Sequence, residues 1–482
     1  MRPASTRIVL VSLFFLIAAP TGIWIALLTP PGMVPDEPAH LTRAAGLLHG
    51  EILGTRELKN IPGRSEPRPQ LNIRIEPAYF TVAVGRTSVI DGRQVVTAAD
   101  TAQVKATQWS NILFPFPTSN TATYFPTFYL PATAALGTGR LLGATPFQCF
   151  RLARLAMLGT FLLLGCSALW LADRGRAVLL TTLFMPMTLF LAASLNEDGV
   201  LIAAGCLAAA ALTKHPRELP RMRIIGAVLL VLIAAAKPPY LPLLGVLLLP
   251  LHKDGFSRRL TQAALSAIPV LTWVAIVGLL CAVPFEKPPY HPGPLWIGAS
   301  SRLLDATDPG ANARILLAHP TRLLTLPWHY VLSDGQQKLK EAVGILGLLS
   351  LNLDDWCYQL WGYAVGFACL TLIWPVPGEA PNRFPMPRRL FETSYVLLIL
   401  VVTCWSVMIS MYVNWTDVGQ ASIDGIQGRY LLVLLPFAIL IPSLMPMRLR
   451  LLPWLPAIPT VVLAVIDLGY LPTRLASFFY LQ

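Results

Sequence analysis

The amino-acid sequence predicts an all-α polytopic membrane protein with about eleven transmembrane helices and a small extracytoplasmic α/β domain in its first long loop. Of the 482 residues, 55% are hydrophobic and 13% are charged, whereas soluble domains contain about 25% charged residues. The basic residues behind the net charge of +12 lie in short clusters between apolar runs, as in cytoplasmic loops and unlike a nucleic-acid-binding face. One long polar stretch, residues 31–121, follows the first apolar run.

Residues 1–30 are predicted to be an N-terminal transmembrane anchor with a cytoplasmic N-terminus. Met1–Arg7 contains two arginines and no acid, and Ile8–Pro30 is apolar and long enough to cross a bilayer. A cleaved signal peptide is the alternative. However, the apolar run exceeds a usual signal-peptide core, and the Pro30-Pro31 junction lacks a small-x-small cleavage site.

Residues 31–121 are predicted to form the first extracytoplasmic loop. This stretch contains nine Lys and Arg residues and eight Asp and Glu residues, so it lacks the basic excess of a cytoplasmic loop. Phe80–Val84, an Asp91-Gly92 turn and Val95-Val96 suggest a β-hairpin inside it. The loop therefore reads as a small folded cap.

Residues 122–143 are predicted to be an interfacial or re-entrant helix. If Tyr124–Leu142 crossed the bilayer, three basic clusters, at 173–176, 214–223 and 252–259, would all lie outside the cell. The positive-inside rule favours the opposite assignment at all three loops. Breaks at Pro126, Pro131 and Gly137 also suit a helix that does not span.

The rest of the chain is predicted to form a transmembrane bundle over 144–284, a second extracytoplasmic loop over 285–353, and a C-terminal transmembrane bundle over 354–482. Several apolar segments, such as Val200–Leu212 and Leu241–Leu251, are shorter than the roughly 20 residues of a straight span. Tilted or partly re-entrant helices that line a protected cavity are therefore expected.

The candidate catalytic residues are Asp36 and Glu37, which follow the first apolar run between Pro35 and Pro38. The prolines stiffen the backbone around the two carboxylates. One carboxylate suits a general base and the other an orienting group or a metal ligand. The alternative is that both acids simply begin a helix, where negative charge is favourable.

The predicted topology places several further polar residues at the same outer face: Asn196, Asp198, Lys237, Asp417, Gln427 and Arg429. Lys237 and Arg429 have no acid adjacent in sequence, and we interpret them as cations for a lipid phosphate. The alternatives are that Lys237 snorkels to lipid headgroups and that Arg429 is an anchor at a helix end.

The sequence contains no HxH or HxxxH pair, no GxxxxGK[ST] loop and no dinucleotide fingerprint. No nucleotide-driven chemistry and no certain cofactor are therefore predicted. The seven cysteines show no CxxC pair and read as small buried hydrophobes.

Five segments in order resemble the motifs of a bacterial multi-pass membrane family catalogued as domain of unknown function 2142: Pro35–His40 with Arg43, Tyr124–Tyr129, Pro186–Asp198, Lys237–Tyr240 and Gln427–Tyr430. That family is similar in layout to the GT-C glycosyltransferases. The resemblance implies that Asp36 is the base and Glu37 its partner or a metal ligand. It adds His40, Arg43, Tyr124, Tyr129 and Tyr240 to the substrate-binding set. The second loop lacks an obvious acidic metal motif, with Asp305 and Asp308 as candidates for a divalent metal.

By this resemblance the chain is expected to move a sugar from a polyprenyl-phosphate donor to an extracytoplasmic glycan, lipid or protein acceptor. It would act in cell-envelope polysaccharide biosynthesis at the outer side of the bacterial inner membrane, among membrane lipids and without nucleic acid. A carboxylate can deprotonate an acceptor hydroxyl, and cations can neutralise a leaving phosphate. The alternatives are a transporter or flippase of lipid-linked saccharides and a non-catalytic protein of the GT-C type.

Overall fold

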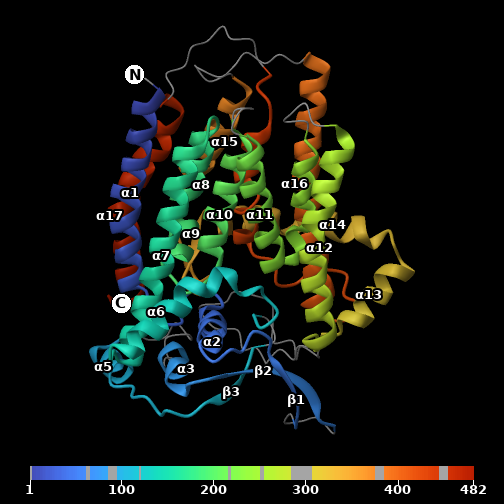
Figure 1. Cartoon of the computed structure of the whole chain (residues 1–482). Coiled ribbons are helices and arrows are strands. Elements are labelled where there is room, and N and C mark those ends of the chain that lie inside the picture. The colour runs from blue at the N-terminus through green and yellow to red at the C-terminus, as the bar shows by residue number, and fades with distance from the viewer. Residues whose placement is uncertain are drawn as a thin grey trace.

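The computed structural model describes residues 3–60, 66–84, 95–118, 121–214, 219–249, 255–283, 307–374, 385–444 and 454–481. These residues form a bundle of long helices with a small three-stranded sheet at one end (Figure 1). The predicted fold class is confirmed in this coarse form. We call the end of the bundle that carries the sheet the sheet end, and the other the opposite end.

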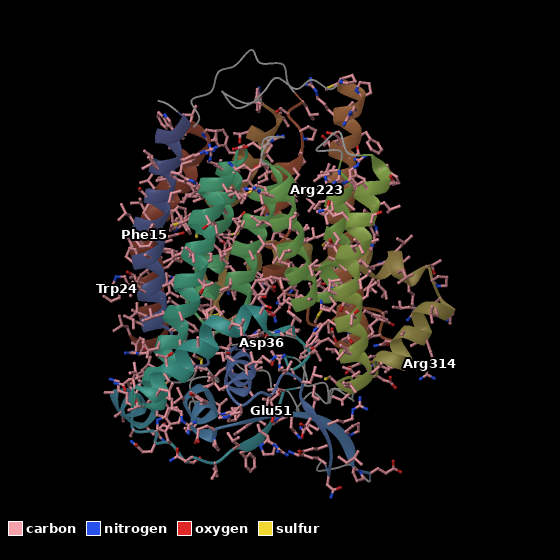
Figure 2. All side chains as sticks on the ribbon, viewed as in Figure 1. Phe15, Trp24, Asp36, Glu51, Arg223 and Arg314 are labelled. Atoms are coloured by element: carbon pink, nitrogen blue, oxygen red, sulfur yellow. The ribbon has the colours of Figure 1, made fainter. Side chains whose placement is uncertain are left out.

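Six helices in the described part of the chain are long and apolar enough to cross a membrane. They are α1 (Pro3–Leu28), α7 (Pro146–Leu171), α12 (Phe256–Leu280), α15 (Asp355–Leu370) with the 3₁₀ turn η3 (Thr371–Ile373) that continues it, α16 (Met386–Asn414) and α17 (Ile458–Tyr480). Their outward faces are apolar, and Phe15 and Trp24 of α1 are each 51% exposed on the outside of the bundle (Figure 2). Shorter apolar helices occupy 198–212, 238–248 and 428–440. The six long helices establish a membrane protein without fixing the predicted total of about eleven spans.

The short apolar segments lie inside the bundle. Helices α8 (Arg176–Phe184) and α9 (Pro186–Ala192) form one broken rod whose residues are almost all buried, and α10 (Asp198–Leu212) packs on α7 and on α11 (Leu219–Ala236). The next segment, η2 (Pro238–Leu248), winds as a 3₁₀-helix. Its rise of about 2.0 Å per residue carries eleven residues over roughly 22 Å, compared with about 17 Å in an α-helix. The 3₁₀ conformation therefore makes this short segment longer than the same residues would be in an α-helix, which the sequence analysis did not predict.

The first loop folds into helices and a sheet. Strands β1 (Thr55–Lys59), β2 (Arg68–Ile75) and β3 (Phe114–Pro117) pair antiparallel in the order β1-β2-β3. They accompany α2 (Glu37–Leu47), α3 (Pro77–Val84) and α5 (Ala98–Lys105).

The predicted strand at Phe80–Val84 is wrong, because these residues belong to α3, whereas the predicted turn at residues 91–92 lies outside the described residues. Pro77 suits the first position of a helix. The buried residues Ala78, Tyr79, Val82 and Ala83 then recur with helical spacing. Helix α3 packs this face against α2 and α7, so tertiary contacts override the β-branched composition of the segment.

Helices α1 and α7 are antiparallel. Arg7 near the start of α1 pairs with Asp173, two residues beyond the end of α7, at 2.8 Å. At the sheet end, Arg154 near the start of α7 donates to the carbonyls of Ala26 and Thr29. The chain from 29 to 145 therefore begins and ends at the sheet end. Its last helices, η1 (Pro126–Tyr129) and the twelve-residue α6 (Leu130–Leu141), lie at that end in Figure 1.

The second loop is largely helical where it is described. It contains α13 (Pro309–Ala318), α14 (Arg322–Gly344) and a short hairpin of β4 (Ile345–Leu346) and β5 (Leu351–Asn352). The metal candidate Asp308 caps α13 by accepting from the Ala311 amide at 2.9 Å. Asp305 lies outside the described residues.

The first prediction concerns orientation. An impermeant thiol reagent added to intact cells is expected to label single cysteines at Lys105 and Arg314, which are exposed on α5 and α13, but not at exposed Arg221, which starts α11 at the opposite end. The background must lack the native cysteines, several of which are only partly buried. Labelling of Arg221→Cys without prior permeabilisation would show that the opposite end faces outside.

Candidate functional site

Asp36 sits at the N-cap of α2 in a left-handed conformation, with φ 62° and ψ 4°. Few side chains tolerate this region, and Asp is among them because its short polar side chain bonds locally. Strained backbone of this kind is often found at functional sites. The Asp36 side chain is 37% exposed, and its Oδ2 pairs with the Arg429 guanidinium. Asp36 therefore presents a carboxylate at the boundary between the bundle and the sheet domain (Figure 2).

Glu37, the next residue, is fully buried and saturated with donors. Arg154 gives its carboxylate two hydrogen bonds, from Nε at 2.8 Å and from Nη2 at 2.6 Å. The amides of Gly32 and Leu195 add two more, at 3.0 and 3.1 Å. Because a carboxylate has about four acceptor positions, none is left here for a metal or a substrate. Glu37 joins the end of α1 to α7 and to the α9–α10 connection.

Four charged side chains form an alternating chain that crosses the site from Asp36 through Arg429 and Asp198 to Lys237. Arg429 pairs with Asp36, and its Nε lies 3.2 Å from Asp198 Oδ2. Asp198 Oδ1 accepts from the Lys237 ammonium. The side chains of Arg429, Asp198 and Lys237 are at least nine-tenths buried, so each charge depends on its neighbours for compensation.

Aromatic rings surround the Lys237 end of this chain. The ammonium lies 5.6 Å from the ring centroid of Tyr124 and 5.2 Å from that of Tyr430, within the range of cation–π attraction. The Tyr240 hydroxyl donates to the Tyr430 carbonyl at 2.9 Å, which fixes η4 (Gly428–Leu431) to η2. Lys237 is therefore held inside the protein and does not extend to lipid headgroups as a snorkelling lysine would.

His40 and Arg43 project from α2 toward the same region. His40 Nδ1 lies 2.6 Å from the Tyr129 hydroxyl, and burial lowers the pKa of His40 to about 3, so the imidazole is neutral at pH 7. Burial also raises the pKa of the Tyr124 and Tyr129 hydroxyls well above the usual value. Arg43 donates to the carbonyls of Glu51, Ile52 and Tyr124, and so fastens α2 to the segment that leads into η1.

The connection between α9 and α10 carries Glu197, which the sequence analysis did not select as a site residue although it lies between two that were selected. Asn196 donates to the Pro35 carbonyl at 3.0 Å and accepts from the Asp198 amide at 2.9 Å. Glu197 between them is fully buried, and neither of its carboxyl oxygens has a hydrogen-bond partner in the described structure. Burial raises the pKa of Glu197 to about 8. Two acids in one tight turn were the available signal, but only the fold shows which one lacks a partner.

Asp417 and Gln427 are not joined to this charged chain by any described contact. Asp417 lies in the loop after α16. Asn312 of α13 donates to the carbonyl of Tyr412, near the end of α16, and to that of Thr416 in the loop. Gln427 is the N-cap of η4 and makes no side-chain capping bond.

Gly428 allows α14 to approach the Arg429 segment closely. A Cβ at this position would lie 2.1 Å from the Lys338 carbonyl oxygen of α14. The Gly428 amide donates to Glu341 at 2.8 Å, and Glu341 also pairs with Lys338. Helix α14 of the second loop therefore packs against the segment that contains Arg429 and helps to position it.

Arg154 is the second residue that the sequence analysis missed. A basic residue in an apolar span is costly unless it is paired, so its position was a usable signal. In the described part of the chain, no three His, Cys, Asp or Glu side chains gather closely enough to hold a metal ion. The site as described consists of carboxylates compensated by cations.

A comparison with protein-family models finds a match over residues 20–439 to a family described as predicted membrane protein (DUF2142). No curated protein and no solved structure matches the chain.

Proposed function

The chain belongs to the DUF2142 family of predicted membrane proteins, and we propose that it is a GT-C-type glycosyltransferase. In this proposal it moves a sugar from a polyprenyl-phosphate donor to an extracytoplasmic glycan, lipid or protein acceptor. The sheet end then faces outward, and the short interior segments complete a bundle of about eleven crossings in the bacterial inner membrane.

The observation that carries the proposal is the pairing of Asp36 with Arg429. A carboxylate that is 37% exposed and a buried guanidinium lie in contact at the end of the bundle. Asp198 forms an ion pair with Arg429 and another with Lys237, so Lys237 lies on the far side of Asp198 from Arg429. This arrangement offers a base to an acceptor and two cations to an anionic leaving group within one site.

The reaction follows from these positions. Asp36 takes the proton of the acceptor hydroxyl, whose oxygen attacks the anomeric carbon. The bond from that carbon to the phosphate oxygen breaks, and its electron pair leaves with the polyprenyl phosphate. Arg429 and Lys237 stabilise the leaving charge. Because Arg429 holds Asp36 in this structure, the donor phosphate replaces Asp36 as the partner of Arg429 and releases the base.

The activity is tested by incubating membranes that contain the protein with a panel of radiolabelled polyprenyl-phosphate sugars. Transfer of label to an acceptor, absent from membranes with Asp36→Asn, supports the proposal. Label that crosses the membrane without transfer would identify a transporter instead.

The second prediction is that Lys237 binds the donor phosphate. Lys237→Met is expected to slow transfer by at least about tenfold at limiting donor, since a charge-assisted hydrogen bond contributes roughly 1.5–3 kcal/mol. Lys237→Arg should restore little activity, because a planar fork does not fit the place of a compact ammonium.

The control for this prediction is the double variant Lys237→Met/Asp198→Asn. It removes the ammonium together with the acid that the ammonium neutralises, so it should recover the thermal stability that Lys237→Met alone loses. If the double variant also recovers the transfer rate, Lys237 serves only to neutralise Asp198.

A further inference from the structure

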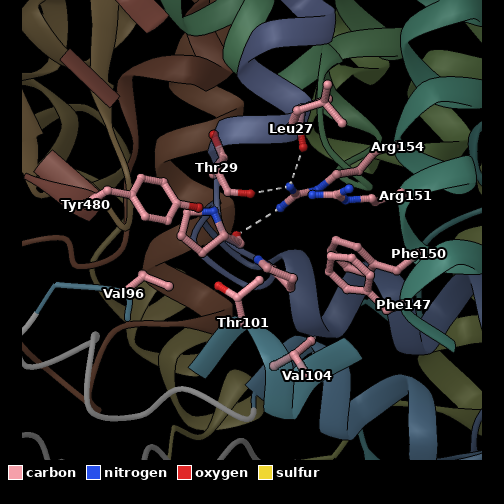
Figure 3. Close-up of a pocket in the computed structure, with 13 residues that line it drawn as sticks. Leu27, Thr29, Val96, Thr101, Val104, Phe147, Phe150, Arg151, Arg154 and Tyr480 are labelled. Atoms are coloured by element: carbon pink, nitrogen blue, oxygen red, sulfur yellow. Dashed lines mark hydrogen bonds between the residues drawn. The ribbon is translucent and has the colours of Figure 1, made fainter. Parts of the chain in front are cut away.

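A pocket separate from the Asp36 site opens at the sheet end between the end of α1, the start of α7, α5 and the C-terminal end of α17 (Figure 3). Its polar lining includes Thr29, Arg151, Arg154 and Tyr480, and Phe147 and Phe150 form an aromatic wall. Leu27, which also lines it, is 37% exposed on the apolar outside of α1. The pocket therefore joins a polar interior to the lipid-facing surface.

Arg151 lines this pocket, and its positive charge has no partner in the described structure. Its guanidinium lies 4.5 Å from the Phe147 ring centroid but has no hydrogen-bond or ion-pair partner among the residues that the structure describes. Arg154, one turn further along α7, is neutralised by Glu37. Because they are three residues apart on one helix, Arg151 and Arg154 face the same side of α7. Glu37 balances the charge of Arg154, and no described acid balances that of Arg151.

Thr29 lines the pocket beside Arg154. Its side chain is buried, and its hydroxyl has no hydrogen-bond partner in the described structure. The Thr29 carbonyl accepts from Arg154 at 2.6 Å, which holds the residue at the pocket wall. The Thr29 hydroxyl oxygen is closed off from the pocket, so it offers no donor to a ligand there.

We propose that this pocket binds the phosphate group of a membrane lipid at the interface. The Arg151 guanidinium presents a planar fork of donors that matches two phosphate oxygens. The site lies where the apolar spans α1 and α7 end, which is the depth of lipid headgroups. The acyl chains then pack on the exposed apolar faces of these two helices. The inference does not depend on the proposed transfer activity.

The test uses the purified full chain, stripped of lipid in detergent, with phosphatidylglycerol as the probe. Retained lipid per chain is counted by native mass spectrometry over a titration. Diacylglycerol with the same acyl chains lacks the phosphate, and inorganic phosphate lacks the chains. Binding by phosphatidylglycerol alone is the expected result. If inorganic phosphate displaces the lipid and binds as tightly, the pocket is a free-anion site and the proposal is overturned.

Variants locate the binding. Arg151→Gln is expected to weaken phosphatidylglycerol binding at least about tenfold, whereas Thr29→Val, which preserves shape and removes only a closed-off hydroxyl, should leave the binding unchanged. Arg151→Lys keeps the charge without the fork and should lie between Arg151→Gln and wild type. Arg314→Gln removes an exposed arginine from α13 at the same end (Figure 2) and is the matched control. Equal lipid affinity of Arg151→Gln, Arg314→Gln and the wild type overturns the proposal.

Discussion

Asp36→Asn is expected to abolish nearly all sugar transfer, with a loss of roughly 10²- to 10⁴-fold in rate, because removal of a general base typically costs that much. The substitution preserves size and keeps a hydrogen-bond acceptor for Arg429. Asn also tolerates the left-handed backbone that this position requires. The variant therefore removes the base without changing the shape or the backbone of the site. The measurement is the initial rate of label transfer from the active donor, in membranes matched for protein content.

Thermal unfolding is the companion measurement for this variant. Asp36 is partly exposed, but buried Arg429 then keeps only Asp198 as a counter-charge, so the melting temperature should fall, by less than in Arg154→Met. If Asp36→Asn inserts normally and transfers sugar at an undiminished rate, the base lies elsewhere. Glu197, a buried carboxyl without a hydrogen-bond partner, is then the next residue to test.

Arg154→Met is expected to produce the largest loss of stability. It leaves Glu37 buried with half of its donors and removes the partner of three carbonyls, those of Ala26, Thr29 and Pro30. Removal of one member of a buried ion pair costs about 3–5 kcal/mol. The measurement is the melting temperature in detergent, together with the fraction of protein that stays monodisperse after extraction.

Arg7→Met is the matched control, because Arg7 joins the same two helices at the opposite end. That pair is more than one-quarter exposed, and Lys214 also contacts Asp173 at 3.2 Å. Removal of an exposed pair costs about 0–1 kcal/mol. Equal shifts in the two variants would show that burial does not make the Arg154–Glu37 pair more important than its partly exposed counterpart.

For the adjacent acids Asp36 and Glu37, the sequence predicted their location but not their different surroundings. Asp36 and Glu37 looked alike between their prolines, and both were interpreted as members of one catalytic pair. In the fold, consecutive residues at a helix start point in different directions, so one faces the open boundary and the other the interior of the bundle. Glu37 meets Arg154, 117 residues away, and no local pattern marks that contact.

Most of the polar set was found from the sequence, because apolar spans and charge bias assign each connection to one end. That reasoning placed Asp36, Asn196, Asp198, Lys237 and Arg429 at a common face, and described contacts join all five. It did not show that the two cations are already paired with acids. Nor did it exclude Asp417, which shares the end but not these contacts.

The sequence by itself determined that this is a membrane protein, because hydropathy and charge are properties of short segments and the bilayer acts on each segment directly. Only the tertiary structure decided which charges meet. The order of partners from Asp36 through Arg429 and Asp198 to Lys237 joins four separate segments of the chain. Buried charges must find counter-charges wherever packing brings them, so their pairing follows from the fold and not from their spacing in sequence.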